Sequence, residues 1–216
     1  MKKILLYSVS FTILLFIFRV FYTGSLMFFF IPWNLFLAWL PFLFSSLLKD
    51  AKATVKNGLL FCMWLLFFPN SPYLITDLFH LEQREGIPLY FDLVLLFTAA
   101  WNGMLMGLLS LKNIEDKLLQ LISAKKVKAI LAFCFFLCGF GIYLGRYERY
   151  NSWNIITQPF NLAKDIAARF IQPWEYPRTW AVTVLFAALL LLIYETLKKM
   201  PAHFSEQASL RKYNQV

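Results

Sequence analysis

The chain has 216 residues, of which 60% are hydrophobic, 19% aromatic and only 15% charged, and its formal net charge is +9. Soluble domains are about 45–50% apolar and about 25% charged, so this composition excludes a soluble globular domain and requires lipid as the solvent for its excess apolar surface. The positive charge does not indicate nucleic-acid binding, because the lysines cluster at the ends of apolar runs, where they suit anionic lipid headgroups.

The first two apolar runs predict two membrane spans. Residues 4–18 follow Lys2 and Lys3 in the manner of a signal peptide. No small-residue cleavage site comes after them, and more hydrophobic segments follow, so we expect an uncleaved first span. Residues 26–48 form a second uncharged run that is long enough to cross, and its two prolines should bend it or shorten its regular part.

The third run predicts a broken span. It begins at Asn57 and stays apolar as far as Phe68, and the sequence Pro-Asn-Ser-Pro follows at 69–72. Two prolines three residues apart break a helix. We therefore expect one helix as far as Phe68, then a break, and then a separate short helix over 73–81 near the outer surface of the membrane.

Three further apolar runs complete six predicted spans in an all-α, polytopic membrane bundle. They are residues 89–111, 127–145 and 179–197. Two other stretches have the periodicity of amphipathic helices: 113–126 is expected on the inner membrane surface and 161–171 on the outer, with Lys164, Asp165 and Arg169 on its polar face. Residues 1–200 are thus predicted to form one transmembrane helical domain, with a short polar cytoplasmic tail at 201–216.

Small residues recur every four positions on two of these runs. Ala99, Gly103 and Gly107 do so on the fourth, and Gly141 and Gly145 on the fifth. Such spacing lets the backbones of neighbouring helices approach closely in lipid. We therefore expect helix contacts at these positions.

The distribution of lysine and arginine predicts the orientation. Six spans put both termini on one side, and if that side is the cytoplasm, the inner segments hold fourteen of the 21 cations. Cytoplasmic segments carry the excess of positive residues, so we expect a multi-pass protein of the cell membrane with both termini in the cytoplasm. The outer cations are nearly all arginine, whose planar guanidinium binds carboxylates and phosphates at two points.

One polar motif lies at the predicted break of the third span. Asn70, Tyr73, Asp77 and His80 are three or four residues apart and fall near one helix face. Asp77 and His80 have the spacing of two metal ligands, or of a general base and the residue that orients it. A lone pair of this kind also occurs as solvated interface residues or as partners of arginine, so we assign no metal and no cofactor to it.

A second polar motif follows the fifth span. Arg146 and Arg149 alternate with aromatic residues, and together with Asn151 and Trp153 they could hold an anionic headgroup or a phosphate. The alternative is a set of interfacial residues in which arginine pairs with Glu148 among aromatic side chains that mark the membrane surface.

The two motifs lie on the same predicted face, and each carries the charge that the other lacks. We therefore expect Asp77 or His80 to lie close to Arg146 or Arg149 in one outward-facing polar cluster. The rival expectation is that the two motifs serve separate neighbours, in which case Asp77 would pair with Arg84.

Two stretches of the chain resemble the signature motifs of a bacterial membrane family, domain of unknown function 1361. They are FFPNSPYLITDLFHL and GRYERYNSWN. The similarity runs from about Pro32 to the last span. The family has a small residue at the position of Ser71 and often an aspartate where this chain has Asn154, which weakens a role for position 154 as a carboxylate. The resemblance implies a polytopic bacterial membrane protein and supplies no reaction.

These observations leave three classes of function open. No nucleotide-binding, hydrolase or metalloprotease fingerprint is present, which favours a non-catalytic membrane protein whose outward-facing site binds an anionic lipid headgroup or a phosphate. The alternatives are a membrane enzyme that acts on a lipid or envelope precursor through Asp77 and His80, and an accessory subunit of a transporter. The expected ligand-binding residues are Asn70, Tyr73, Asp77, His80, Arg146, Arg149, Asn151 and Trp153.

Overall fold

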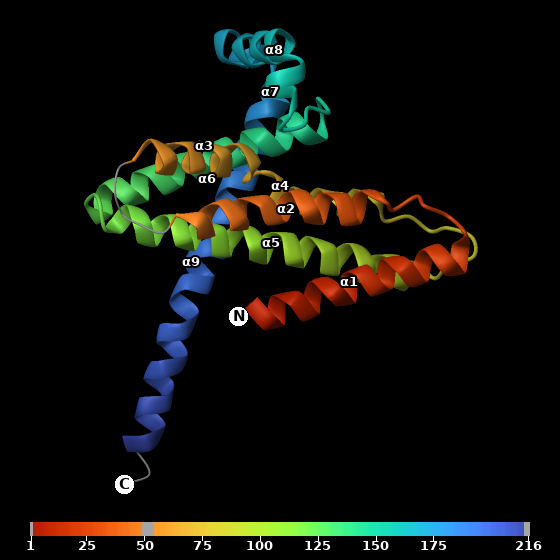
Figure 1. Ribbon diagram of the computed structural model, residues 1–216, viewed down its shortest axis with the longest axis horizontal. Helices are drawn as coiled ribbons and strands as arrows, with labels where there is room; N and C mark the ends of the chain where they lie inside the picture. The colour runs from red at the N-terminus through yellow and green to blue at the C-terminus, as the bar shows by residue number, and fades with distance from the viewer. Residues whose placement is uncertain (1, 49–53, 214–216) are drawn as a thin grey trace.

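The computed structural model describes residues 2–48 and 54–213, and side chains within 3–48 and 54–200, as a bundle of helices with no strand in these ranges (Figure 1). Six segments are long and apolar enough to cross a membrane. They are Lys3–Thr23, Phe30–Leu47, Val55–His80, Leu89–Leu119, Ala124–Arg146 and Pro177–Met200. The predicted all-α, multi-pass fold is therefore confirmed.

Six long helices make up the bundle, and shorter helices connect two pairs of them. The long helices are α1 (Lys2–Thr23), α2 (Phe30–Leu47), α3 (Val55–Phe67), α5 (Leu89–Leu119), α6 (Ala124–Arg146) and α9 (Pro177–Tyr213). The connecting helices are α4 (Asn70–Tyr73) and η1 (Leu74–His80) before α5, and α7 (Asn154–Thr157), α8 (Pro159–Ile171) and η2 (Pro173–Glu175) before α9.

The long helices are not equally enclosed. α5 and α6 bury most of their apolar windows, whereas α1 buries little and packs on α5 at the edge of the bundle. Figure 1 shows α2 and α5 side by side, α9 crossing α6 obliquely, and α7 and α8 standing to one side of the bundle. One end of the bundle is called the distal end below. It is the end at which α1 ends, α2 begins and η1 leads into α5.

The predicted break of the third span is confirmed. α3 ends at Phe67, a single α-helical turn follows at α4, and η1 continues as a 3₁₀-helix. Pro69 and Pro72 cause the change, because neither has a backbone N–H to donate within a continuous α-helix. This segment lies between α2 and α5 rather than on a surface, and Leu74 and Thr76 are fully buried.

Small residues make the burial of this segment possible. A Cβ on Gly103 of α5 would lie 2.5 Å from the main-chain oxygen of Ser71, so only glycine lets the two backbones approach this closely. On α6, Gly141 packs against Pro69 and Gly145 against the ring of Tyr73. The expected helix contacts at these glycines are therefore present.

The prediction of a separate surface helix at 113–126 is wrong. α5 continues to Leu119, and α6 begins at Ala124 after a short turn. Most of the apolar stripe of this stretch packs in or against the core, since Ile114 is fully buried and Leu118 and Ile122 lie against it, whereas Leu121 is exposed. Glu115 is buried as well, because the Tyr194 hydroxyl donates to it and Lys198 pairs with it.

The predicted outer helix at 161–171 is present as α8, but the polar face expected for it is wrong in part. Arg169 is buried and pairs with Glu148, at 2.6 Å between nitrogen and oxygen. Phe170, expected on the apolar face, is 53% exposed. A charged side chain faces the protein here because Glu148 pairs with it and the main-chain oxygen of Asp165 accepts a hydrogen bond from it. The rings of Tyr143 and Tyr176 lie beside the guanidinium.

Candidate functional site

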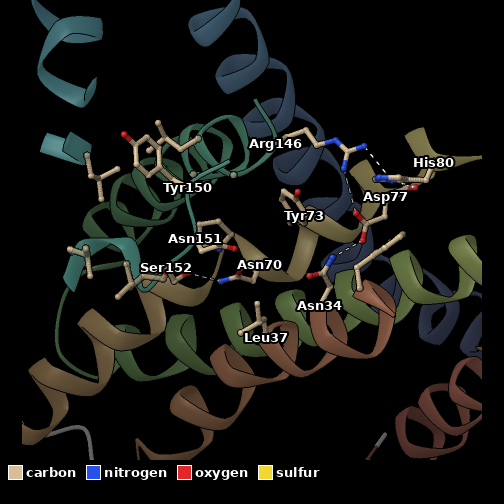
Figure 2. A pocket seen from close by; sticks show the side chains of 18 residues that line it. Asn34, Leu37, Asn70, Tyr73, Asp77, His80, Arg146, Tyr150, Asn151 and Ser152 are labelled. Carbon is tan, nitrogen blue, oxygen red and sulfur yellow. Dashed lines mark hydrogen bonds and ion pairs between the residues drawn. The ribbon is translucent and has the colours of Figure 1, made fainter. Parts of the chain in front are cut away.

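A pocket of about 380 Å³ lies at the distal end, where α2, α4, η1 and α6 meet the chain that leads into α7 and α8 (Figure 2). Polar and charged side chains line it together with apolar ones. The polar and charged residues are Asn34, Asn70, Tyr73, Asp77, His80, Arg146, Tyr150, Asn151 and Ser152; the others are Phe30, Leu37, Leu66, Pro69, Gly141, Leu144, Gly145, Ile155 and Leu162.

Asp77 is the most deeply buried of the charged residues in the pocket, with 2% of its side chain exposed. η1 places its carboxylate between α2 and α6. Asn34 donates from Nδ2 to one carboxylate oxygen at 2.9 Å, and a terminal nitrogen of Arg146 lies 3.7 Å from the other. The two predicted motifs thus meet in an ion pair, as the sequence predicts.

His80 touches both members of this pair. Its Nδ1 lies 3.2 Å from the main-chain oxygen of Asp77 and 3.4 Å from Arg146, and its ring packs on Phe30 at 4.8 Å between centroids. The imidazole is therefore oriented by the main-chain carbonyl of Asp77 and not by the Asp77 carboxylate. Arg146 keeps 17% of its side chain exposed, so the guanidinium is the accessible charge of the group.

The other side of the pocket carries uncharged polar groups. Asn70 donates from Nδ2 to Ser152 and to the main-chain oxygen of Phe67, both at 2.9 Å. The Tyr150 hydroxyl donates to Asp165 of α8 at 2.7 Å, and this hydrogen bond raises the pKa of Tyr150. These contacts connect α4, the end of α6 and α8 around the pocket.

Six of the eight predicted ligand-binding residues line the pocket, and Arg149 and Trp153 do not. Arg149 is exposed and has a positive φ of 58°, and it forms no ion pair among the residues that the structure describes. Trp153 packs against Trp33 of α2, with 6.2 Å between ring centroids. That the six lining residues bind a ligand remains a prediction.

The structure adds Asn34, Tyr150 and Ser152 to the predicted set. Asn34 is the one amide in the apolar run 26–48, and a polar group within a span is costly unless it has a partner, so its position was a usable signal. Ser152 has no comparable signal, because serine is an ordinary residue in a loop.

The rival pairings take different partners. Glu148 accepts a hydrogen bond from Tyr143 and pairs with Arg169, so it is not engaged with Arg149. Arg84 pairs with Asp92 and Glu82 rather than with Asp77.

A second charged group lies at the distal end, apart from the pocket. Arg19 of α1 forms a two-point contact with Asp92 of α5, at 2.7 and 3.0 Å, and both side chains are buried. The Arg19 guanidinium also lies 4.0 Å from the centre of the Phe28 ring. This pair fastens α1 to the bundle and lines none of the pocket.

The chemical repertoire of the pocket is a carboxylate, an imidazole, a guanidinium and a set of neutral donors and acceptors. Among the side chains described, in residues 3–48 and 54–200, no group of three or more His, Cys, Asp or Glu has the arrangement of a metal site. Glu82, which could add a ligand to Asp77 and His80, instead has 72% of its side chain exposed and contacts Arg84.

Comparison with known families gives one match. Residues 33–193 match the family described as "Protein of unknown function (DUF1361)". The curated proteins and the solved structures give no match. The matched range includes every residue of the pocket except Phe30, and it leaves out α1.

Proposed function

The chain belongs to the DUF1361 family, whose description supplies no activity, and we propose from the pocket that it binds a membrane amphiphile through an anionic headgroup, on the outer side of the cell membrane. The single observation that carries this proposal is the state of Arg146. Its guanidinium faces the pocket, is partly exposed, and contacts Asp77 and His80 only at 3.7 and 3.4 Å.

Long contacts leave the guanidinium free to bind something closer. A phosphate accepts two parallel N–H bonds from arginine at about 2.7–2.9 Å, and such charge-assisted bonds are about twice as strong as neutral ones. Asp77 does not compete for this geometry, because its carboxylate is buried and takes a hydrogen bond from Asn34. It keeps the guanidinium at the mouth of the pocket by charge attraction.

The apolar part of the lining supports an amphiphile over a free anion. Phe30 and Leu37 of α2, Leu66 of α3, and Ile155 and Leu162 beyond α6 surround the polar groups. Ligand sites combine a mostly apolar wall with a few polar groups that fix orientation. A lipid would fit this lining with its tail along the apolar wall and its headgroup at the polar groups.

Binding can be measured on the purified full-length protein with phosphatidylglycerol in detergent micelles, by native mass spectrometry. Arg146→Gln should weaken binding by about tenfold to a hundredfold, since it removes one or two charge-assisted hydrogen bonds. Arg149→Gln is the matched control, because Arg149 belongs to the same motif and lies outside the pocket. Equal losses in both variants, or none in Arg146→Gln, would refute the proposal.

A membrane enzyme is the second candidate function. The observation that favours it is the presence of Asp77 and His80 in one pocket beside Arg146, where a headgroup phosphate would sit. Loss of headgroup turnover in Asp77→Asn, with lipid binding retained, would identify this activity.

A further inference from the structure

The pocket has two chemically different sides. Arg146, Asp77 and His80 provide its charges, and all three gather on one side (Figure 2). Asn70 and Asn151 lie on the other, with Tyr73 between the two sides. The lining described by the structure includes no charged side chain on that second side, since the remaining polar groups there are the Ser152 and Tyr150 hydroxyls.

Several of these neutral groups have hydrogen-bonding capacity to spare. Within the described residues, neither the side-chain amide of Asn151 nor the hydroxyl of Tyr73 makes a hydrogen bond, and Asn70 uses only its NH₂ group. Together they offer one NH₂ donor, two amide oxygens and a hydroxyl that can do both. A headgroup that ended at its phosphate would make no hydrogen bond to these groups and would leave them to water.

We propose that the ligand is a lipid phosphodiester whose second substituent is a neutral, polyhydroxylated ring, either a sugar or a cyclitol. This rests on the proposed function, because it takes the phosphate to lie at Arg146. Ring hydroxyls both donate and accept, which matches amides and a phenol. The Tyr73 ring adds an aromatic surface beside them.

The same lining argues against the common charged headgroups. An ammonium substituent is held most strongly by a carboxylate that is free to receive it. Asp165, the acid beside Tyr150, lies outside the lining and already accepts a hydrogen bond from the Tyr150 hydroxyl. Asp77 is buried and faces Asn34 and Arg146.

Four lipids with the same acyl chains test this inference by native mass spectrometry of the full-length protein. They are phosphatidic acid, phosphatidylglycerol, phosphatidylethanolamine and phosphatidylinositol. Phosphatidylinositol should bind about tenfold more tightly than phosphatidic acid or phosphatidylethanolamine, which is about 1.4 kcal/mol. Phosphatidylglycerol, with two hydroxyls and no ring, should fall between them.

Two variants locate the preference. Asn151→Ala and Tyr73→Phe should reduce the advantage of phosphatidylinositol to about threefold or less, because each removes one neutral hydrogen-bonding group. Neither should change the binding of phosphatidic acid. Arg146→Gln should weaken every lipid, because it removes the phosphate contact that all four share.

The outcomes separate the two proposals. Equal affinity for all four lipids in the wild-type protein would overturn the ring assignment and leave the phosphate site standing. Failure of the wild-type protein to bind any of them would overturn the proposed function. Soluble inositol 1-phosphate distinguishes the source of the headgroup: we expect it to bind at least tenfold more weakly than the lipid, and equal binding would overturn the assignment to a lipid.

Discussion

At the scale of single residues, the pocket depends on how the charge of Asp77 is balanced. A carboxylate with 2% of its surface exposed is costly unless hydrogen bonds and an opposite charge compensate it. Asn34 supplies the first and Arg146 the second. Of the two charged partners, the acid is the buried one and the arginine the accessible one.

This asymmetry makes a prediction for the pair. Arg146→Ala should lower the free energy of unfolding by about 1–3 kcal/mol, because it leaves the buried carboxylate with one neutral partner. Adding Asp77→Asn, which removes the charge and keeps the shape, should restore part of the loss. Denaturant unfolding in micelles measures both, and a double variant whose losses simply add would contradict the coupling.

The sequence predicts Asp77, His80 and Arg146 in this pocket and also the neutral Asn70, Tyr73 and Asn151, but it misses other neutral members such as Asn34. Asp77 and Arg146 come from two short motifs whose charges are complementary and whose spans end on the same side. Asn34 lies in a different apolar run, and nothing in the spacing of either motif points to it. Arg149 shows the converse: its φ of 58° turns the chain just after α6, so a side chain three positions from Arg146 faces away from the pocket.

At the scale of helices, close backbone approach fixes the position of the broken third span. Gly103→Ala should lower the free energy of unfolding by about 1–3 kcal/mol, because its Cβ would lie 2.5 Å from the main-chain oxygen of Ser71, which cannot move aside. Gly58→Ala on α3 is the matched control, since no atom lies within 4 Å of its Cβ position. We expect it to be neutral or stabilising, and thermal unfolding of both variants in micelles would show the contrast.

The packing of α1 on α5 involves a buried ion pair between Arg19 and Asp92. Arg19→Ala should destabilise the protein by about 3–5 kcal/mol, because Asp92 is buried and would lose its two-point partner. Arg19→Met with Asp92→Leu should cost less, because it leaves no buried carboxylate without its two-point partner. Arg84, which also pairs with Asp92, keeps its contact with Glu82. If the single and double variants unfold at the same denaturant concentration, the loss in Arg19→Ala does not come from an uncompensated Asp92 carboxylate.

The periodicity of a helix indicates which of its faces is apolar, but not which other helix that face packs against. The stretch 113–126 has the periodicity of a surface helix. Its first turn is nevertheless buried, because Ile114 packs in the core and Glu115 binds Tyr194 and Lys198. On α8, Arg169 lies on what the sequence marks as the polar, exposed face, and Glu148 holds it inside. In both cases a partner distant in the sequence decides burial, and periodicity carries no information about it.

At the scale of the whole molecule, the number of spans follows from the apolar runs of the sequence. The orientation of these spans in the membrane remains a proposal. The excess of positive residues on one side predicts that both termini face the cytoplasm. A reporter that is active only in the cytoplasm should work when fused after Val216 and fail when inserted near Glu85, in the segment between η1 and α5. Activity at Glu85 would reverse the orientation and move the pocket to the inner side.

The partners of Asp77 are synthesised at different times, one before it and one after it. Asn34 precedes Asp77 by 43 residues, whereas Arg146 follows Asp77 by 69 (146 minus 77). At about 5–20 residues per second, Arg146 is synthesised roughly 3–14 s after Asp77. During that interval α3, with 13 residues and about 20 Å of length, is too short to cross lipid without η1, which carries the carboxylate. A chain that stalls before α6 therefore lacks the guanidinium that pairs with this buried acid in the complete protein.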